Sequence, residues 1–252
     1  MSDKETVTIS RAAAKRLIKD IKQLKKEPLT GIFYTHDDND ILKGQAMIIG
    51  PEDTPYHGGY YLFKFSFPGD YPHQPPKVTF CTNDGSTRMH PNMYKNGKVC
   101  LSLLNSWQGR DATDAWTGCQ SISSILLTLR SIMTEGPLQH EPGCGENHRD
   151  YYKYSEIVRF RNIGLAIHDI LTQESFSDIF PELIDIAKKD YVDNFESKLE
   201  ALFKANKCWD NRNKNVIVEK GRVYTSMYNL SCTIDYDGLE KKLVDLRNNL
   251  KK

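Results

Sequence analysis

The sequence lacks any apolar run long enough to cross a bilayer, and its opening residues, MSDKETVT, lack the apolar centre of a secretory signal. We therefore expect a cytoplasmic or nuclear protein with no membrane partner. An excess of charge of one sign is also absent, because 34 basic residues face 33 acidic residues and the formal net charge is +1. A nearly neutral chain has no overall field that would hold it on nucleic acid, so we expect no nucleic-acid partner.

Cysteine is scarce, and the six cysteines lack the regular spacing of a small disulfide-stabilised scaffold. We expect free thiols in a reducing compartment, most of them simply packed. The arrangement His140-x-x-x-Cys144-x-x-x-His148 could indicate zinc, but a fourth nearby ligand is missing, so we expect no metal site. Four cysteines are expected to be filler rather than nucleophiles: Cys81, Cys119, Cys208 and Cys232.

The length of 252 residues suffices for one sizeable core and a small second unit. Apolar residues at three- and four-residue spacing predict an amphipathic helix over residues 10–27, capped by Ser10 and ended by Pro28. Short segments separated by turns rich in glycine, proline, aspartate and asparagine follow this helix. They predict consecutive antiparallel strands at 31–34, 45–49, 60–67 and 77–80.

Beyond the strands, residues 81–120 show little periodicity, although two tryptophans argue against disorder there. The segment SISSILLTLRSIM, at 121–133, has no strong polar face and predicts a buried central helix. Further helices are expected at 151–171, 181–204 and 236–250, and residues 216–234 are ambiguous, with a short hairpin as one interpretation. The predicted class is α+β, with a main domain at 8–172 and a mainly helical extension at 173–252.

The most informative segment is His90-Pro91-Asn92, which precedes Cys100 with Gly97 three residues before the cysteine. This pattern resembles the signature of the ubiquitin-conjugating enzymes. Two further segments match that family in order and spacing, at 50–59 and 67–78. The resemblance covers residues 10 to about 172. It implies the UBC fold, with an N-terminal helix, a four-stranded antiparallel meander and C-terminal helices.

The resemblance implies that Cys100 accepts the C-terminus of ubiquitin or a ubiquitin-like modifier as a thioester and passes it to a lysine amine or a ligase cysteine. Asn92 would either donate its amide to the oxyanion of that transfer or order the neighbouring loop. His90 is expected to brace the loop through hydrogen bonds. His140 falls where many members carry an acidic gate residue, so it is either a base for the incoming lysine or an exposed loop residue. Glu141 is the alternative acid.

The implied partners are the modifier, a ubiquitin-activating enzyme, a ubiquitin ligase and a protein substrate. No cofactor is expected on this chain, because the activating enzyme uses the ATP. By alignment, the basic face of the first helix would meet the activating enzyme through Lys15, Arg16 and Lys19, although such a face is usually only solvated. His73 replaces a large apolar side chain of the usual ligase surface, and Gly118 lies in the loop Thr-Gly-Cys that replaces a Ser-Pro-Ala-like loop. Standard RING or HECT ligases are therefore expected to bind poorly.

Three features depart from small members: extra residues before His90, an insertion at 108–115, and the long C-terminal region. Trp116, rather than Trp107, is the better match to the family tryptophan. These departures are similar to the long, Z-type subgroup, which is charged by a second, less common activating enzyme and can carry a second modifier. Two rival functions are a cysteine hydrolase that uses Cys100 with His90 and a catalytically dead ubiquitin-binding variant, which the presence of Cys100 disfavours. The extension would be an interaction module or a stabilising cap.

Overall fold

The chain begins with a helix that is capped as its sequence predicts. The computed structural model describes residues 8–106, 115–213 and 221–252. Helix α1 spans Arg11–Lys26, and the Ser10 hydroxyl oxygen accepts a hydrogen bond from the Ala13 amide at 3.0 Å. Burial of its apolar stripe, which includes Leu17, fixes α1 against the core. The predicted N-terminal helix is confirmed.

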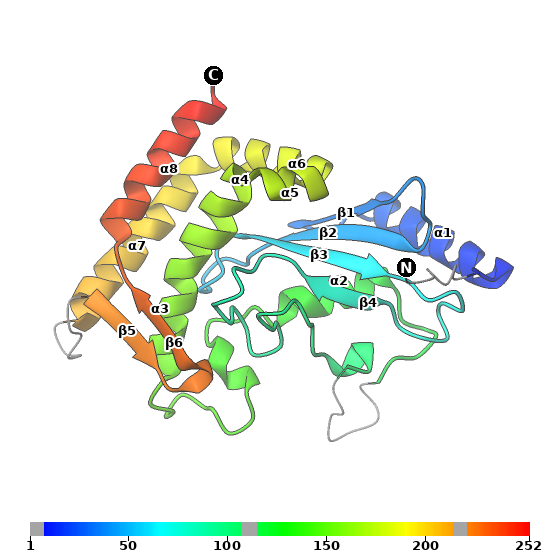
Figure 1. The fold of residues 1–252 in the computed structure, drawn as a ribbon, viewed down its shortest axis with the longest axis horizontal. Helices are drawn as coiled ribbons and strands as arrows, with labels where there is room; N and C mark the ends of the chain where they lie inside the picture. The colour runs from blue at the N-terminus through cyan, green and yellow to red at the C-terminus, as the bar shows by residue number, and fades with distance from the viewer. Residues whose placement is uncertain (1–7, 107–114, 214–220) are drawn as a thin grey trace, which may run out of the picture.

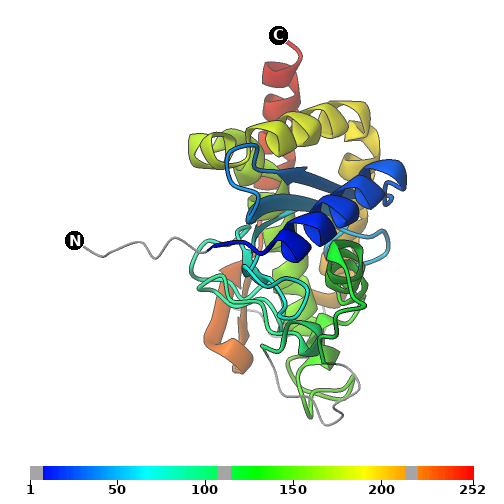
Figure 2. The same cartoon turned by 90° about the vertical axis from the view of Figure 1, so that its right-hand side faces the viewer.

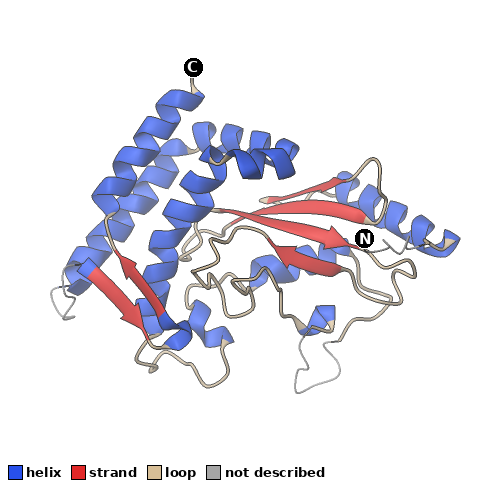
Figure 3. Ribbon diagram, in the orientation of Figure 1, coloured by secondary structure: helices blue, strands red, loops and turns tan. Residues whose placement is uncertain are grey.

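A four-stranded antiparallel sheet follows α1 (Figures 1 and 3). The strands lie side by side in chain order, as in a meander, and Met47 faces Leu62 across the central pair. All four predicted strands are confirmed, the last with identical bounds and the others with ends that differ by at most two residues. The strands are β1 (Ile32–His36), β2 (Lys43–Ile49), β3 (Tyr60–Ser66) and β4 (Lys77–Phe80).

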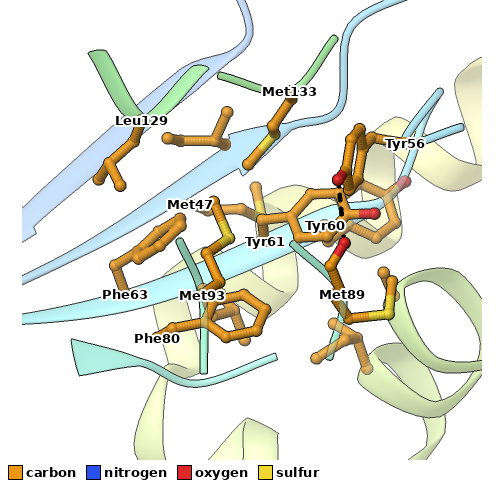
Figure 4. Close-up of a cluster of buried hydrophobic side chains, with 14 of the residues drawn as sticks. Met47, Tyr56, Tyr60, Tyr61, Phe63, Phe80, Met89, Met93, Leu129 and Met133 are labelled. Atoms are coloured by element: carbon orange, nitrogen blue, oxygen red, sulfur yellow. Dashed lines mark hydrogen bonds between the residues drawn. The ribbon is translucent and has the colours of Figure 1, made fainter. Parts of the chain in front are cut away.

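The core forms where helix α2 (Ile122–Ser131) packs on the inner face of this sheet. Figure 4 shows Leu129, with Met133 just beyond the helix, beside Met47 and Phe63 of the strands. Ser121 begins α2 with a capping box, in which the Ser121 hydroxyl accepts from the Ser124 amide and the Ser124 hydroxyl accepts from the Ser121 amide. The predicted central helix is confirmed and one of its sides is buried in the core, but the other side is not, because Leu127 is 48% exposed.

The helix predicted at 151–171 is continuous but not uniform. It consists of α3 (Tyr151–Arg161), a π-helical stretch η4 (Asn162–Asp169) and the short α4 (Ile170–Thr172). The π-helical stretch begins at Asn162, whose buried side chain accepts from the Tyr61 hydroxyl at 2.6 Å and donates to the His57 carbonyl at 2.9 Å. This side chain joins the helix to the sheet.

The prediction of a single helix at 181–204 is wrong. The structure has α6 (Pro181–Asp193) and α7 (Phe195–Asn213), and the backbone leaves helical geometry at Asn194. Asn194 is the C-cap of α6, with φ −109° and ψ 22°, and its backbone amide makes the last bond of that helix, to the Asp190 carbonyl at 2.9 Å. A short helix that the sequence did not indicate, α5 (Glu174–Ile179), precedes α6.

The rest of the extension is a hairpin, β5 (Arg222–Thr225) with β6 (Leu230–Thr233), and helix α8 (Tyr236–Leu250). The hairpin interpretation and the final helix are confirmed. The apolar side chains of the extension belong to the same hydrophobic cluster as those of the sheet. Figure 2 shows α6 lying over the sheet, where it contacts β1, and α8 packs on α6, α7 and η4 rather than standing at the end of a linker. The boundary between 172 and 173 stays a prediction. Within the described ranges, no helix is long and apolar enough to span a membrane.

Candidate active site

Asn92 and Cys100 hold each other through two hydrogen bonds. The Cys100 amide donates to the Asn92 carbonyl at 2.8 Å, and the Asn92 side-chain amide donates to the Cys100 carbonyl at 2.6 Å. Between them the chain folds back through a bridge that pairs Met93 with Val99. This turn brings together the two residues that the sequence motif identified, and it uses the Asn92 side chain to order the loop.

Gly97 explains why that turn can close. Its φ is +85°, in the left-handed region that glycine adopts at little cost. A Cβ atom at this position would lie 2.9 Å from the carbonyl oxygen of Phe80 in β4. The Gly97 carbonyl in turn accepts from the Phe80 amide at 2.8 Å. The glycine of the motif therefore lets the turn rest directly on the sheet edge.

The Cys100 residue is only 6% exposed, and its sulfur lies 3.4 Å from the carbonyl oxygen of Ser106. The Ser106 hydroxyl accepts from the Leu101 amide at 2.9 Å and donates to the Leu101 carbonyl at 3.1 Å. The short helix η1 (Ser102–Leu104) lies between these residues. The segment after the cysteine is thus folded back on itself and fixes the sulfur at the end of the turn.

His90 is fully buried and serves as the anchor of the turn. Its Nε2–H donates to the Ile132 carbonyl at 2.9 Å, just beyond α2, and its Nδ1 accepts from the Asn92 amide at 2.9 Å. Burial, with the neighbouring His140 as the next cause, holds the pKa of His90 well below its ordinary value. Both ring nitrogens of this neutral imidazole are occupied by backbone groups. The geometry supports a bracing role.

His140 lies in the short helix η3 (Pro137–His140), with its ring centroid 4.8 Å from that of His90. Its Nε2 is 3.2 Å from the Thr134 hydroxyl, and burial lowers the pKa of His140 below its ordinary value. The side chain is half-buried, so it is neither a freely exposed loop residue nor fully enclosed. Glu141 points elsewhere, because its carboxylate accepts a hydrogen bond from Tyr228 of the extension.

The predicted contacts of α1 divide into two kinds. Lys15 and Lys19 are exposed, as a docking face requires. Arg16 is half-buried instead, and its guanidinium donates to the Gly118 carbonyl at 2.6 Å and pairs with Asp20 at 2.9 Å. It is therefore already occupied within the chain, and it connects the first helix to the loop of the predicted ligase surface.

His73 and Gly118, the two positions predicted for the ligase surface, are both exposed. Their loops are joined by Trp116, whose indole N–H donates to the Pro72 carbonyl at 2.8 Å. This contact is consistent with Trp116 as the match to the family tryptophan. Trp107 and residues 108–114 of the predicted insertion lie outside the described residues.

The positions of the cysteines and the possibility of a metal site can be checked only in the described residues. There, no three or more His, Cys, Asp or Glu side chains gather in a group that could hold a metal ion. Cys119 is exposed, Cys144 is buried, and Cys81 and Cys232 are intermediate. The side chain of Cys208 lies outside the described residues.

The sequence reasoning missed two residues beside the turn, Arg88 and Tyr228. The Arg88 guanidinium carbon lies 3.5 Å from the ring centroid of Tyr94 and 4.4 Å from the ring centroid of Tyr228. No motif signals this contact, because it joins positions far apart in the sequence, and the two residues meet only after the extension folds back.

Comparison with known proteins connects this geometry to a family. Residues 16–162 match the family model described as "Ubiquitin-conjugating enzyme". Among curated relatives, "Ubiquitin-conjugating enzyme E2 Z" of Xenopus tropicalis is 39% identical over 186 residues, which cover 72% of this chain and 58% of that protein. The Homo sapiens protein of the same name is 44% identical over 159 residues, which cover 62% of this chain and 44% of that protein.

A more distant relative is "Probable ubiquitin-conjugating enzyme protein 17" of Caenorhabditis elegans, 32% identical over 79% of this chain and 28% of that protein. The chain thus matches between about a quarter and six tenths of the length of these relatives. Among solved structures, human ubiquitin-conjugating enzyme E2 G1 gives a TM-score of 0.42 at 34% identity, over 49% of this chain and 94% of that chain.

Proposed function

The chain belongs to the ubiquitin-conjugating enzyme family, a family of transferases, and from this premise we propose that it carries ubiquitin or a ubiquitin-like modifier as a thioester on Cys100. It then passes the modifier to a lysine amine of a protein substrate or to a ligase cysteine. The observation that supports this proposal best is the reciprocal pair of hydrogen bonds between Asn92 and Cys100. That pair fixes a thiol beside the motif that the family shares.

In the charging step, the Cys100 thiolate attacks the thioester carbonyl carbon that links the modifier to an activating enzyme. A new C–S bond forms, the old C–S bond breaks, and the thiolate of the activating enzyme leaves. One thioester replaces another, and cysteine is intrinsically nucleophilic, so no strong base beside the sulfur is required. ATP is consumed by the activating enzyme before this exchange, and this chain binds no cofactor.

In the transfer step, a lysine amine attacks the same carbonyl carbon and an oxyanion forms. The Asn92 amide carries two N–H donors, and one of them is held by the Cys100 carbonyl at 2.6 Å. The second N–H is the donor that we assign to the oxyanion. Neutral His140 accepts the proton that the attacking amine loses, and the Cys100 thiolate leaves as the amide bond is completed.

The hydrolase alternative fits the geometry poorly. A hydrolase needs a base aimed at the sulfur, and His90 is the candidate that the motif offers. Both His90 nitrogens are bonded to backbone groups, of Ile132 and Asn92. We therefore expect no cleavage of ubiquitin thioesters or peptides when ATP and the activating enzyme are left out.

Similarity to the E2 Z proteins supports the finer proposal that the second, less common ubiquitin-activating enzyme charges this chain. The exposed Lys15 and Lys19 would meet an acidic surface of that enzyme. Standard ligases would bind weakly, because His73 and Gly118 offer no large apolar anchor. The reaction would take place in the cytoplasm or the nucleus.

A charging assay tests the function. Wild-type protein, ATP, ubiquitin and each of the two activating enzymes should give a reductant-sensitive adduct with at least one enzyme, and Cys100→Ala should abolish it. Cys119→Ala is the matched control, because Cys119 is exposed, unlike the other cysteines whose side chains the structure describes, and would capture any indiscriminate thiol reaction. An adduct that survives in Cys100→Ala and disappears in Cys119→Ala would contradict the proposal.

A further inference from the structure

The tip of the β5–β6 hairpin is fixed in an uncommon backbone conformation. It forms the short helix η6 (Met227–Asn229), in which Tyr228 has φ +59°, a region that residues other than glycine seldom adopt. Buried Asp150, just before α3, accepts from the Ser226 hydroxyl and the Met227 amide, both at 2.9 Å. The tip is therefore anchored to the core, and Figure 1 shows the hairpin alongside α3.

The ring of Tyr228 packs on the segment that precedes the turn from Asn92 to Cys100, which we call the catalytic turn. It lies over the Arg88 guanidinium at 4.4 Å and edge-on to Tyr154 at 5.7 Å. The Tyr154 hydroxyl donates to the Arg88 carbonyl at 2.7 Å, and the Arg88 guanidinium donates to the Pro91 carbonyl, which lies inside the His-Pro-Asn motif. The two tyrosines thus hold both ends of Arg88.

Ring contacts matter at Arg88 because its hydrogen bonding is incomplete. Its Nε is buried and has no hydrogen-bond partner within the described part of the chain. The rings of Tyr94 and Tyr228 lie over the guanidinium and stabilise its charge through cation–π contacts. Without the ring of Tyr228, one face of the guanidinium would be uncovered, and its bond to Pro91 would be free to shift.

The hydroxyl of the same tyrosine reaches the other loop of the site. It donates to the Glu141 carboxylate, and Glu141 directly follows His140. Burial raises the pKa of Tyr228, and its hydrogen bond to Glu141 and the charge of that carboxylate raise it further. The phenol therefore stays protonated and remains a donor. One side chain of the extension consequently contacts both loops that meet where His90 and His140 face each other.

The geometry points to Tyr228 as a positioning residue through which the C-terminal extension holds the Asn92 loop and the His140 loop in the arrangement that transfers the modifier to lysine. This inference rests on the proposed function. The groups whose positions Tyr228 controls act on the oxyanion and on the attacking amine. Charging is thioester exchange at the Cys100 sulfur and uses neither the second Asn92 N–H nor His140, so it should depend on Tyr228 far less than transfer does.

Single-turnover discharge of the Cys100 thioester to free lysine tests the inference. Tyr228→Ala should lower the maximal discharge rate about tenfold or more, the scale of a small misplacement of catalytic groups. Its charging rate and the lysine concentration for half-maximal rate should stay within about twofold of wild type. Tyr228→Phe keeps the ring on Arg88 and loses only the bond to Glu141, so it should discharge at a rate between wild type and Tyr228→Ala.

Tyr224→Phe is the matched control. Tyr224 lies on the same hairpin, is 53% exposed, and bonds Asn229 at 3.0 Å, so removing its hydroxyl should leave discharge unchanged. Should Tyr228→Ala fail to fold by thermal melting, Tyr228→Phe decides the matter, since it removes a single oxygen atom. Wild-type discharge in Tyr228→Phe and in folded Tyr228→Ala would overturn the inference, as would equal loss of charging and discharge. Either result leaves the proposed function intact, which fails only if wild type does not charge on Cys100.

Discussion

At the scale of single residues, Asn92 has two tasks that one substitution can separate from charging. Its side chain orders the turn by bonding the Cys100 carbonyl, and its second N–H is proposed for the oxyanion. Asn92→Ala should therefore reduce discharge to lysine about 10²-fold, the scale of one oxyanion donor, while the thioester still forms. The yield of thioester in the charging reaction measures its formation, and single-turnover rates on the pre-charged protein measure discharge to lysine.

The control for this prediction is Asn96→Ala in the same turn. The Asn96 side chain accepts from the Lys98 amide at 3.1 Å, so the change disturbs the turn by a similar hydrogen bond. If Asn92 acted only by ordering the loop, the two variants would slow discharge by similar factors. A wild-type discharge rate in Asn92→Ala would refute both roles.

His140 provides a pH dependence whose direction follows from its surroundings. Burial lowers the pKa of His140, so the ring is neutral above its ordinary pKa of about 6.5 and gains a proton only at lower pH. As a base it should contribute fully from pH 6.5 to 8 and lose its contribution as the pH falls below 6.5. The ratio of the wild-type discharge rate to the His140→Ala discharge rate, measured at each pH, gives the contribution of His140. The ionisation of the substrate lysine affects both rates equally and cancels in this ratio.

Glu141→Ala, measured in the same way, distinguishes the gate base from its neighbour. The Glu141 carboxylate is held by Tyr228, so its loss should slow discharge by a factor that does not vary with pH over this range. A ratio that stays at one from pH 6 to 8 for both His140→Ala and Glu141→Ala would remove the gate role from this loop.

At the scale of elements, the sequence predicted the segments whose local signals agree with their final environment. The first helix has a cap, an apolar stripe and a terminating proline, and each of the four strands ends in a turn signal. Local chemistry decides these features. The residues of the turn, Asn92, Gly97 and Cys100, were identified instead by resemblance to the family signature, and their hydrogen-bonded geometry appeared only in the structure.

Elements set by distant contacts were predicted less well. The π-helical stretch depends on Asn162, which bonds a tyrosine of β3 and a backbone carbonyl near residue 57, and periodicity cannot show either contact. The break between α6 and α7 falls at a single asparagine, Asn194, within an otherwise helical pattern. Arg88 and Tyr228 belong to the same class, because their contact exists only in the folded chain.

At the scale of the whole molecule, the extension is built into the domain that it follows. Lys198 of α7 is the clearest junction, with its ammonium bonded to the Gly58 carbonyl at 2.9 Å and to Asp190 at 3.1 Å, over the ring of Tyr60. Its side chain is 5% exposed, so these contacts lie out of water. The buried ammonium of Lys198 thus connects α7 to α6, to the loop at Gly58 and to Tyr60 of the sheet.

This junction leads us to predict that the sheet and the extension unfold together. Lys198→Met should lower the free energy of unfolding by about 2 kcal/mol, because it leaves the buried Gly58 carbonyl without its donor and removes the positive charge beside Asp190, which keeps the Tyr60 hydroxyl and the Asn194 amide. Lys204→Met on the same helix is the control, since that side chain is 77% exposed and should change stability by less than about 0.5 kcal/mol. Calorimetry should show a single transition that shifts to lower temperature in Lys198→Met, since one hydrophobic cluster spans both parts. A separate early transition in that variant would instead show that the extension unfolds independently of the sheet.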